Sequence, residues 1–206
     1  MSIADKLTTI AENEQKVYDK GKTDEQHAFW ESNQKKGLRK QYPYAFYGNW
    51  WTDDIYNPIY NIKHEAGISM FQDSGITDTK VAIDLRNFLG SPTALFKNSK
   101  LKKIRKLIVN ETFSYEGGIF TDCNYLTDIE FDGTIGKSIS FAQSPLNIES
   151  LKNIILHLKD YSGGSTETHI LTLKDGCKTL LEENGNTSPN GNLWTEYVSD
   201  LGWTLA

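Results

Sequence analysis

The sequence predicts an α/β fold, a short and irregular solenoid with an N-terminal helix and a helical C-terminal cap. Two observations predict it: a segment recurs at a period in the mid-twenties, and each copy ends in a short alternating strand. One strand per copy at such a period is typical of leucine-rich repeats, so the solenoid is expected to be leucine-rich-repeat-like. The expected parts are an N-terminal helix (1–24), an aromatic-rich N-terminal cap (25–68), the repeat region (69–145) and a C-terminal cap (146–206).

The copies share one order of residue types. Phenylalanines fall at 71, 96 and 120, which are 25 and 24 residues apart. A small residue follows three positions later, and an aliphatic residue two or three after that: Ser74, Ser99 and Cys123, then Ile76, Leu101 and Leu126. Strands are expected at 81–85, 107–109 and 129–131, and Asp132-Gly133 is expected to close the last strand as a turn. Because one copy has too little apolar surface to fold alone, it should bury these side chains against the next copy.

The first segment has a helical pattern. Ile3, Ile10 and Val17 lie seven residues apart, as the a positions of a heptad do. Residues 1–20 are therefore either an assembly segment, which pairs copies of the chain as a coiled coil, or one helix docked on its own domain or on a partner. The segment is acidic and contains lysines, without an apolar stretch, so no Sec signal peptide is predicted.

Residues 42–60 are crowded with aromatic side chains. One interpretation is a stacking platform for sugars or bases, with Trp50, Trp51 and Tyr56 as ligand-binding candidates. The other interpretation, which we favour, is an aromatic cap over the open end of the solenoid.

Residues 146–206 do not continue the repeat. Asn147 is expected to cap a helix whose apolar face carries Leu151, Ile154, Ile155 and Leu158. A strand is expected at 169–173, a short helix ending at Asn184-Gly185, a second helix at 194–201 and an edge strand at 203–205. A non-repeating end of this kind is typical of a capping unit.

Six basic residues lie within ten positions of the repeat region: Lys97, Lys100, Lys102, Lys103, Arg105 and Lys106. Several should project from the exposed sheet face, and Lys102, Lys103 and Arg105 are ligand-binding candidates for an anionic polymer. The alternative, which we favour, is a solvated rim whose charge is balanced by Asp122, Asp128 and Glu130.

Composition and motifs exclude several classes of function. The formal net charge of -5 does not favour nucleic acid, and no apolar run is long enough for membrane insertion. Cys123 and Cys177 are expected to be buried free thiols, since two distant cysteines do not make a disulfide framework. The four histidines are scattered, and no catalytic, phosphate-binding or metal-binding motif occurs. We therefore expect no enzyme, no cofactor and no metal.

The copy Ile119-Phe120-x-x-Cys123-x-x-Leu126-x-x-Ile129 resembles the repeat of the BspA-type leucine-rich repeat family. Segments on both sides look like those that flank such repeats in proteins of gut Firmicutes and their phages: 29–31, 44–46, 51–53, 144–158, 171–173 and 202–205. The resemblance implies a leucine-rich-repeat fold, no catalysis, and a role in surface adhesion or in a phage tail structure. The expected partner is a protein or a cell-surface polysaccharide, on a phage virion or at a bacterial cell surface. The alternative is a carbohydrate-binding module that uses residues 42–60.

Overall fold

The computed structural model of the chain describes the backbone of residues 59–61 and residues 71–79, 82–86, 93–115, 117–185 and 187–206. The predicted N-terminal helix (1–24), and the predicted aromatic cap (25–68) apart from 59–61, lie outside the described residues.

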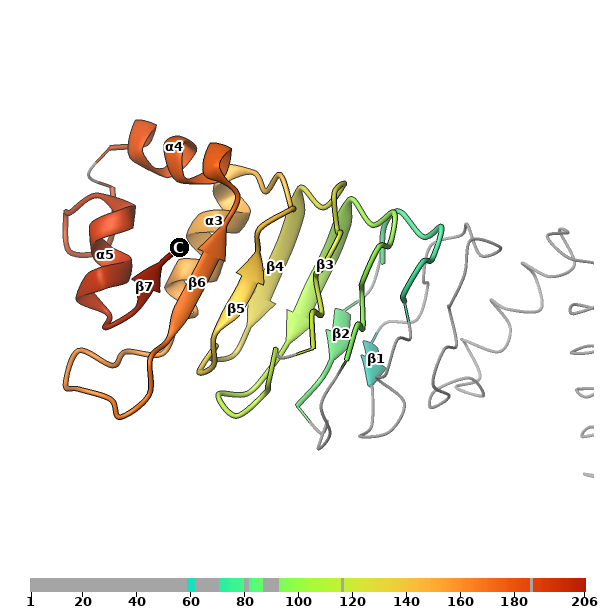
Figure 1. The fold of residues 1–206 in the computed structure, drawn as a ribbon, viewed down its shortest axis with the longest axis horizontal. Coiled ribbons are helices and arrows are strands. Elements are labelled where there is room, and N and C mark those ends of the chain that lie inside the picture. Colours follow the sequence, from blue (N-terminus) through green and yellow to red (C-terminus); the bar gives the residue numbers. More distant parts are fainter. Residues whose placement is uncertain (1–58, 62–70, 80–81, 87–92, 116, 186) are drawn as a thin grey trace, which may run out of the picture.

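Four parallel strands form the first sheet, and they follow one another in chain order: β1 (Ile59–Asn61), β2 (Ala82–Asp84), β3 (Lys103–Ile108) and β4 (Asp128–Asp132). In Figure 1 they succeed each other along the long axis of the molecule, with helices α3, α4 and α5 gathered at the C-terminal end. Each strand thus pairs with the strand of the preceding copy. Residues 59–61, expected to belong to the N-terminal cap, continue this sheet.

The turns that contain the phenylalanines stack in the same way. The N–H of Phe71 donates to the carbonyl of Leu95 at 2.8 Å, and the N–H of Phe96 donates to the carbonyl of Ile119 at 3.0 Å. Two residues after each phenylalanine, the backbone enters the left-handed region, with φ of 55° at Asp73, 51° at Asn98 and 57° at Asp122. Asn and Asp adopt this conformation more readily than other residues with a side chain. The corner of each copy therefore has the same geometry, which allows the next copy to stack on it.

The core lies between the sheet and these turns. The rings of Phe71, Phe96, Phe120 and Phe141 stack in a row, with successive centroids 5.2, 5.4 and 4.6 Å apart. The first three follow the predicted spacing. The fourth, Phe141, comes only 21 residues after Phe120, and its place in this row was not predicted.

The small residues behind the phenylalanines are buried as well: Ser74, Ser99, Cys123 and Ser144. The Cys123 thiol donates to the carbonyl of Phe96 at 3.1 Å, and the Ser144 hydroxyl donates to the carbonyl of Cys123 at 3.2 Å. At Cys123 and Ser144 a small donor therefore ties one copy to the backbone of the copy before it, whereas the buried hydroxyls of Ser74 and Ser99 make no such bond.

A second parallel sheet follows the phenylalanine-containing turns on the same side of the core. It consists of β5 (Ile139–Phe141), β6 (Ile170–Leu173) and β7 (Thr204–Leu205). The strands predicted near 169–173 and 203–205 are confirmed as β6 and β7. The strand β5 was not predicted.

Three helices complete the C-terminal part: α3 (Ile148–Leu156), α4 (Asp175–Glu183) and α5 (Trp194–Asp200). The predicted cap of α3 is confirmed, since the side chain of Asn147 accepts from the N–H of Ser150 at 2.8 Å. The prediction that Leu158 belongs to the apolar face of this helix is wrong. The helix ends at Leu156, and Leu158 instead forms a parallel bridge with Ile135.

Helix α3 takes the place of a further strand beside β4. The Ser150 hydroxyl accepts from the N–H of Ile129 at 2.8 Å, and the Asn153 side-chain oxygen accepts from the N–H of Phe131 at 2.6 Å. Residues three apart share one face of a helix, so both acceptors reach the same strand. The sheet therefore ends at a covered edge rather than at an exposed row of donors, which would favour pairing with another chain.

This edge contact predicts a stability effect. Replacing Ser150 or Asn153 by Ala should each lower the free energy of unfolding by about 1–3 kcal/mol, because a backbone donor loses its partner. Asn153→Asp keeps the acceptor and should retain most of the stability. Urea denaturation measures the effect, with Ser199→Ala on the exposed side of α5 as the matched control. Losses at Ser150 and Asn153 no larger than the control's would contradict the assignment.

Candidate interaction surface

The outward face of the first sheet is shaped by an irregularity in β3. Ile104 pairs with Ile129 and Leu107 pairs with Phe131, so two residues of β3, Arg105 and Lys106, oppose the single residue Glu130. This β-bulge keeps Ile104 and Leu107 in the core although they are three positions apart, and it leaves both cations outside it. The predicted bounds of this strand, 107–109, are wrong, because β3 spans Lys103–Ile108. The bulge interrupts the alternation of buried and exposed residues, so the sequence pattern does not show where the strand begins.

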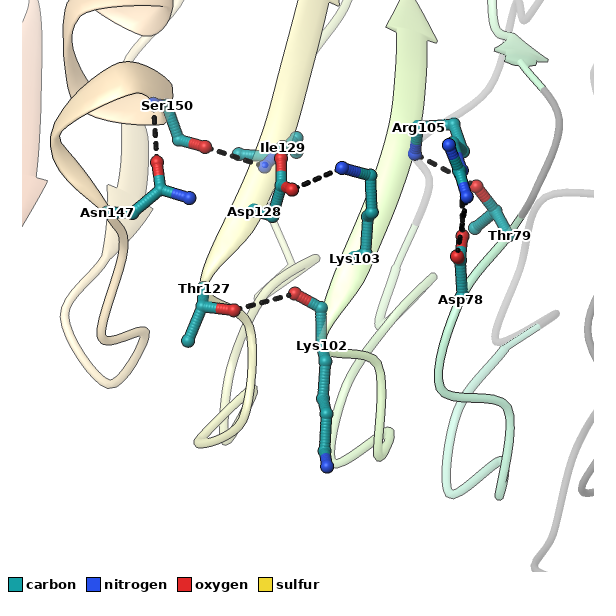
Figure 2. Close-up of polar contacts among 10 residues, drawn as sticks. All are labelled: Asp78, Thr79, Lys102, Lys103, Arg105, Thr127, Asp128, Ile129, Asn147 and Ser150. Atoms are coloured by element: carbon teal, nitrogen blue, oxygen red, sulfur yellow. Dashed lines mark hydrogen bonds and ion pairs between the residues drawn. The ribbon is translucent and has the colours of Figure 1, made fainter.

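Figure 2 shows two cations of this face bound to carboxylates, one on β4 and one on the segment that precedes β2. Lys103 pairs with Asp128 on β4. Arg105 pairs with Asp78 through two bonds, from Nε to Oδ1 at 3.3 Å and from Nη2 to Oδ2 at 3.1 Å. The backbone N–H of Arg105 also donates to the Thr79 hydroxyl at 3.0 Å. The segment that precedes β2 is thereby fastened to β3.

The second cation of the bulge has two carboxylate neighbours. The Nζ of Lys106 lies 3.1 Å from Oε1 of Glu130 and 4.0 Å from Oδ2 of Asp132. The hydrogen bond to Glu130 raises the pKa of Lys106 above its usual value. Both partners are about half exposed, so water screens the pair strongly.

The charges of the sheet face nearly balance. Around β3, three cations face four carboxylates: Lys103, Arg105 and Lys106 with Asp78, Asp128, Glu130 and Asp132. At the end of β2, the ion pair of Arg86 with Asp84 adds one charge of each sign. Of the acids expected to balance the basic run, Asp128 and Glu130 do so. Asp78 and Asp132 were not expected among the acids that balance this charge. Only their place in the sheet brings them to these cations.

Lys102 lies just before β3, and its side chain is exposed. Its carbonyl accepts from the Thr127 hydroxyl at 3.2 Å and from the N–H groups of Thr127 and Asp128, both at 3.0 Å. In Figure 2 its side chain extends away from the strands. The structure thus brings the candidates Lys102, Lys103 and Arg105 together on one strand and its lead-in. The aromatic candidates Trp50, Trp51 and Tyr56 lie outside the described residues.

The two cysteines and the possible metal ligands are further candidates for reactive groups. Cys123 and Cys177 are free and buried, as predicted, and burial raises the pKa of Cys123 to about 12. A thiol in that state is a poor nucleophile at neutral pH. Within the described residues, no group of three or more His, Cys, Asp or Glu side chains is arranged to hold a metal ion. No helix in the same part of the chain has the length and apolar character to cross a bilayer.

His169 is the one buried histidine among the described residues. Its Nε2 lies 2.9 Å from the Ser165 hydroxyl, which also accepts from the N–H of Glu167 at 3.1 Å. The imidazole stacks on the ring of Tyr161, with centroids 3.8 Å apart and the planes parallel. Burial lowers the pKa of His169, and the ammonium groups of Lys137 and Lys159 lower it further, while Glu167 opposes them. The Ser165–His169 contact fastens the exposed loop 162–168 to the end of the second sheet.

This histidine predicts a pH effect on stability. Its folded-state pKa lies below the unfolded value of 6.5, so the unfolded chain takes up the proton first as the pH falls. Its contribution should be complete above pH 6.5 and should be lost as the pH falls through 6.5 towards the lowered folded pKa. Urea denaturation at pH 7.5 and pH 5.5 measures this loss, which should be smaller in His169→Gln. The same loss in both chains would contradict the assignment.

Comparisons with protein-family models, with curated proteins and with solved structures found no match to the chain. Its function is therefore inferred from the sequence pattern and from the geometry.

Proposed function

We propose that the chain is a non-enzymatic binding or assembly module, built as a short leucine-rich-repeat-like solenoid of the BspA type. It holds a protein partner on the outward face of β2, β3 and β4, in a phage tail structure or at a bacterial cell surface. The observation that carries the proposal is the set of exposed, paired charges that the β-bulge presents on a parallel sheet.

The energies of the ion pairs support recognition rather than a purely structural role. Their side chains are between 21% and 54% exposed, and exposed pairs typically contribute about 0–1 kcal/mol to stability. Such pairs exchange partners at little loss to the fold. Charges arranged in this way confer specificity and speed of association more than affinity.

The balance of charge supports a protein rather than an anionic polymer at this face. A polyanion would meet four carboxylates beside the three cations, and their repulsion would offset the attraction. A folded protein carries both signs of charge and can match both. Because α3 covers the edge of β4, a partner at this edge would engage side chains rather than add a strand.

The test separates the charge pattern from the fold. A charge-swapped chain carries Lys103→Glu with Asp128→Lys and Lys106→Glu with Glu130→Lys, so the two short ion pairs and the net charge are kept, and only the 4.0 Å contact of residue 106 with Asp132 is lost. Its free energy of unfolding should change by less than about 1 kcal/mol. Its affinity for the partner should fall by about tenfold or more, because each of the four swapped charges now faces a partner group of like sign.

The partner is found by photo-crosslinking in the producing organism. The crosslinking residue stands at Asp132 on the sheet face or, as the matched control, at the exposed Glu183 on α4. We expect a protein adduct at position 132 that is absent at 183 and absent in the charge-swapped chain. No adduct at 132, or an adduct that persists after the swap, would contradict the proposal.

A further inference from the structure

A second surface lies at the turns that lead into β3 and β4. Lys100 and Lys102 stand on either side of Leu101, which is buried, and both are exposed. Tyr125 precedes the buried Leu126 in the next copy and is 54% exposed. Tyr125 and Leu156 are the two large hydrophobic residues exposed in the described part of the chain. We call Lys100, Lys102 and Tyr125 the turn surface.

The backbone brings these two turns together. The carbonyl of Lys102 accepts from Thr127 and Asp128, and Lys103 pairs in register with Asp128. Paired parallel segments lie about 5 Å apart, which is within reach of one sugar residue. Since Leu101 and Leu126 occupy the core, the residues beside them project to the outside of the same corner.

The lysines of the turn surface differ from the cations of the sheet face. Lys103, Arg105 and Lys106 are each held by a carboxylate. Among the described residues, the ammonium groups of Lys100 and Lys102 form no ion pair. Their charge is therefore available to an external anion, and the exposed phenol of Tyr125 is carried by the neighbouring turn.

We propose that the turn surface binds an acidic glycan, a polysaccharide whose sugar rings carry carboxylates. The face of Tyr125 would pack against the C–H face of one sugar ring, while the lysines bind its carboxylates. The chain's net charge of -5 does not oppose this, because at physiological salt exposed charges are screened beyond about 8 Å. This site lies apart from the protein-binding face, and it takes a different class of partner.

Three probes separate charge from ring stacking: polygalacturonate has rings and carboxylates, polyphosphate has charge without rings, and dextran has rings without charge. Titration calorimetry on the full chain at physiological salt should detect polygalacturonate alone as a clear binder. Lys100→Ala with Lys102→Ala should weaken its binding about tenfold, and Tyr125→Ala about fivefold.

The matched control is Lys103→Ala with Lys106→Ala, which removes the same charge from the sheet face. It should change the affinity for polygalacturonate by less than about twofold, because those cations already form ion pairs with carboxylates of the chain. Three results would each overturn the proposal: equal losses in the control and in the Lys100 and Lys102 chain, tight binding of polyphosphate that is indifferent to Tyr125→Ala, or no binding of polygalacturonate. The turn surface is tested with glycan probes and the sheet face with a crosslinked protein partner, so the two proposals fail independently.

Discussion

The backbone hydrogen bonds between equivalent residues of successive copies hold the rest of this structure in place. They pair β1 to β4 in parallel and stack the turns behind them, from Phe71 to Leu95 and from Phe96 to Ile119. The row of phenylalanine rings between the two sides repeats at the same step, because each ring is carried by one copy. Stacking also fixes where each exposed side chain projects.

Both proposed surfaces follow from that constraint. The repeat demands a buried side chain at fixed positions, and the residues between them are free to vary. On β3 the bulge places two cations between buried Ile104 and Leu107, where one pairs with an acid before β2 and the other with an acid on β4. In the turns, Lys100 and Lys102 flank buried Leu101, and no acid of the described residues pairs with either lysine. One run of basic residues is thus divided into two sites of different character.

Features that depend on nearby residues could be predicted from the sequence, and features that depend on pairing between distant segments could not. The phenylalanine spacing, the buried thiols, the cap at Asn147 and the strands β6 and β7 depend on local pattern, and they were predicted. The bulge at Arg105, the place of Phe141 in the ring stack and the acids opposite the basic run depend on registers between distant segments. Nothing in the local sequence reports those registers. The predicted end of α3 failed because Leu158 fits a helical face equally well but is taken by a bridge to Ile135.

The most direct test of the stacked arrangement is native-state amide hydrogen exchange. The N–H groups of Leu85, Phe96 and Val109 each donate to the next copy, to the carbonyls of Ile108, Ile119 and Asp132. If the copies form one cooperative stack, these three amides should exchange slowly and with similar opening free energies, close to that of global unfolding. Rapid exchange of Leu85 and Phe96, beside slow exchange of Val109, would contradict the account, because the copies would then open independently.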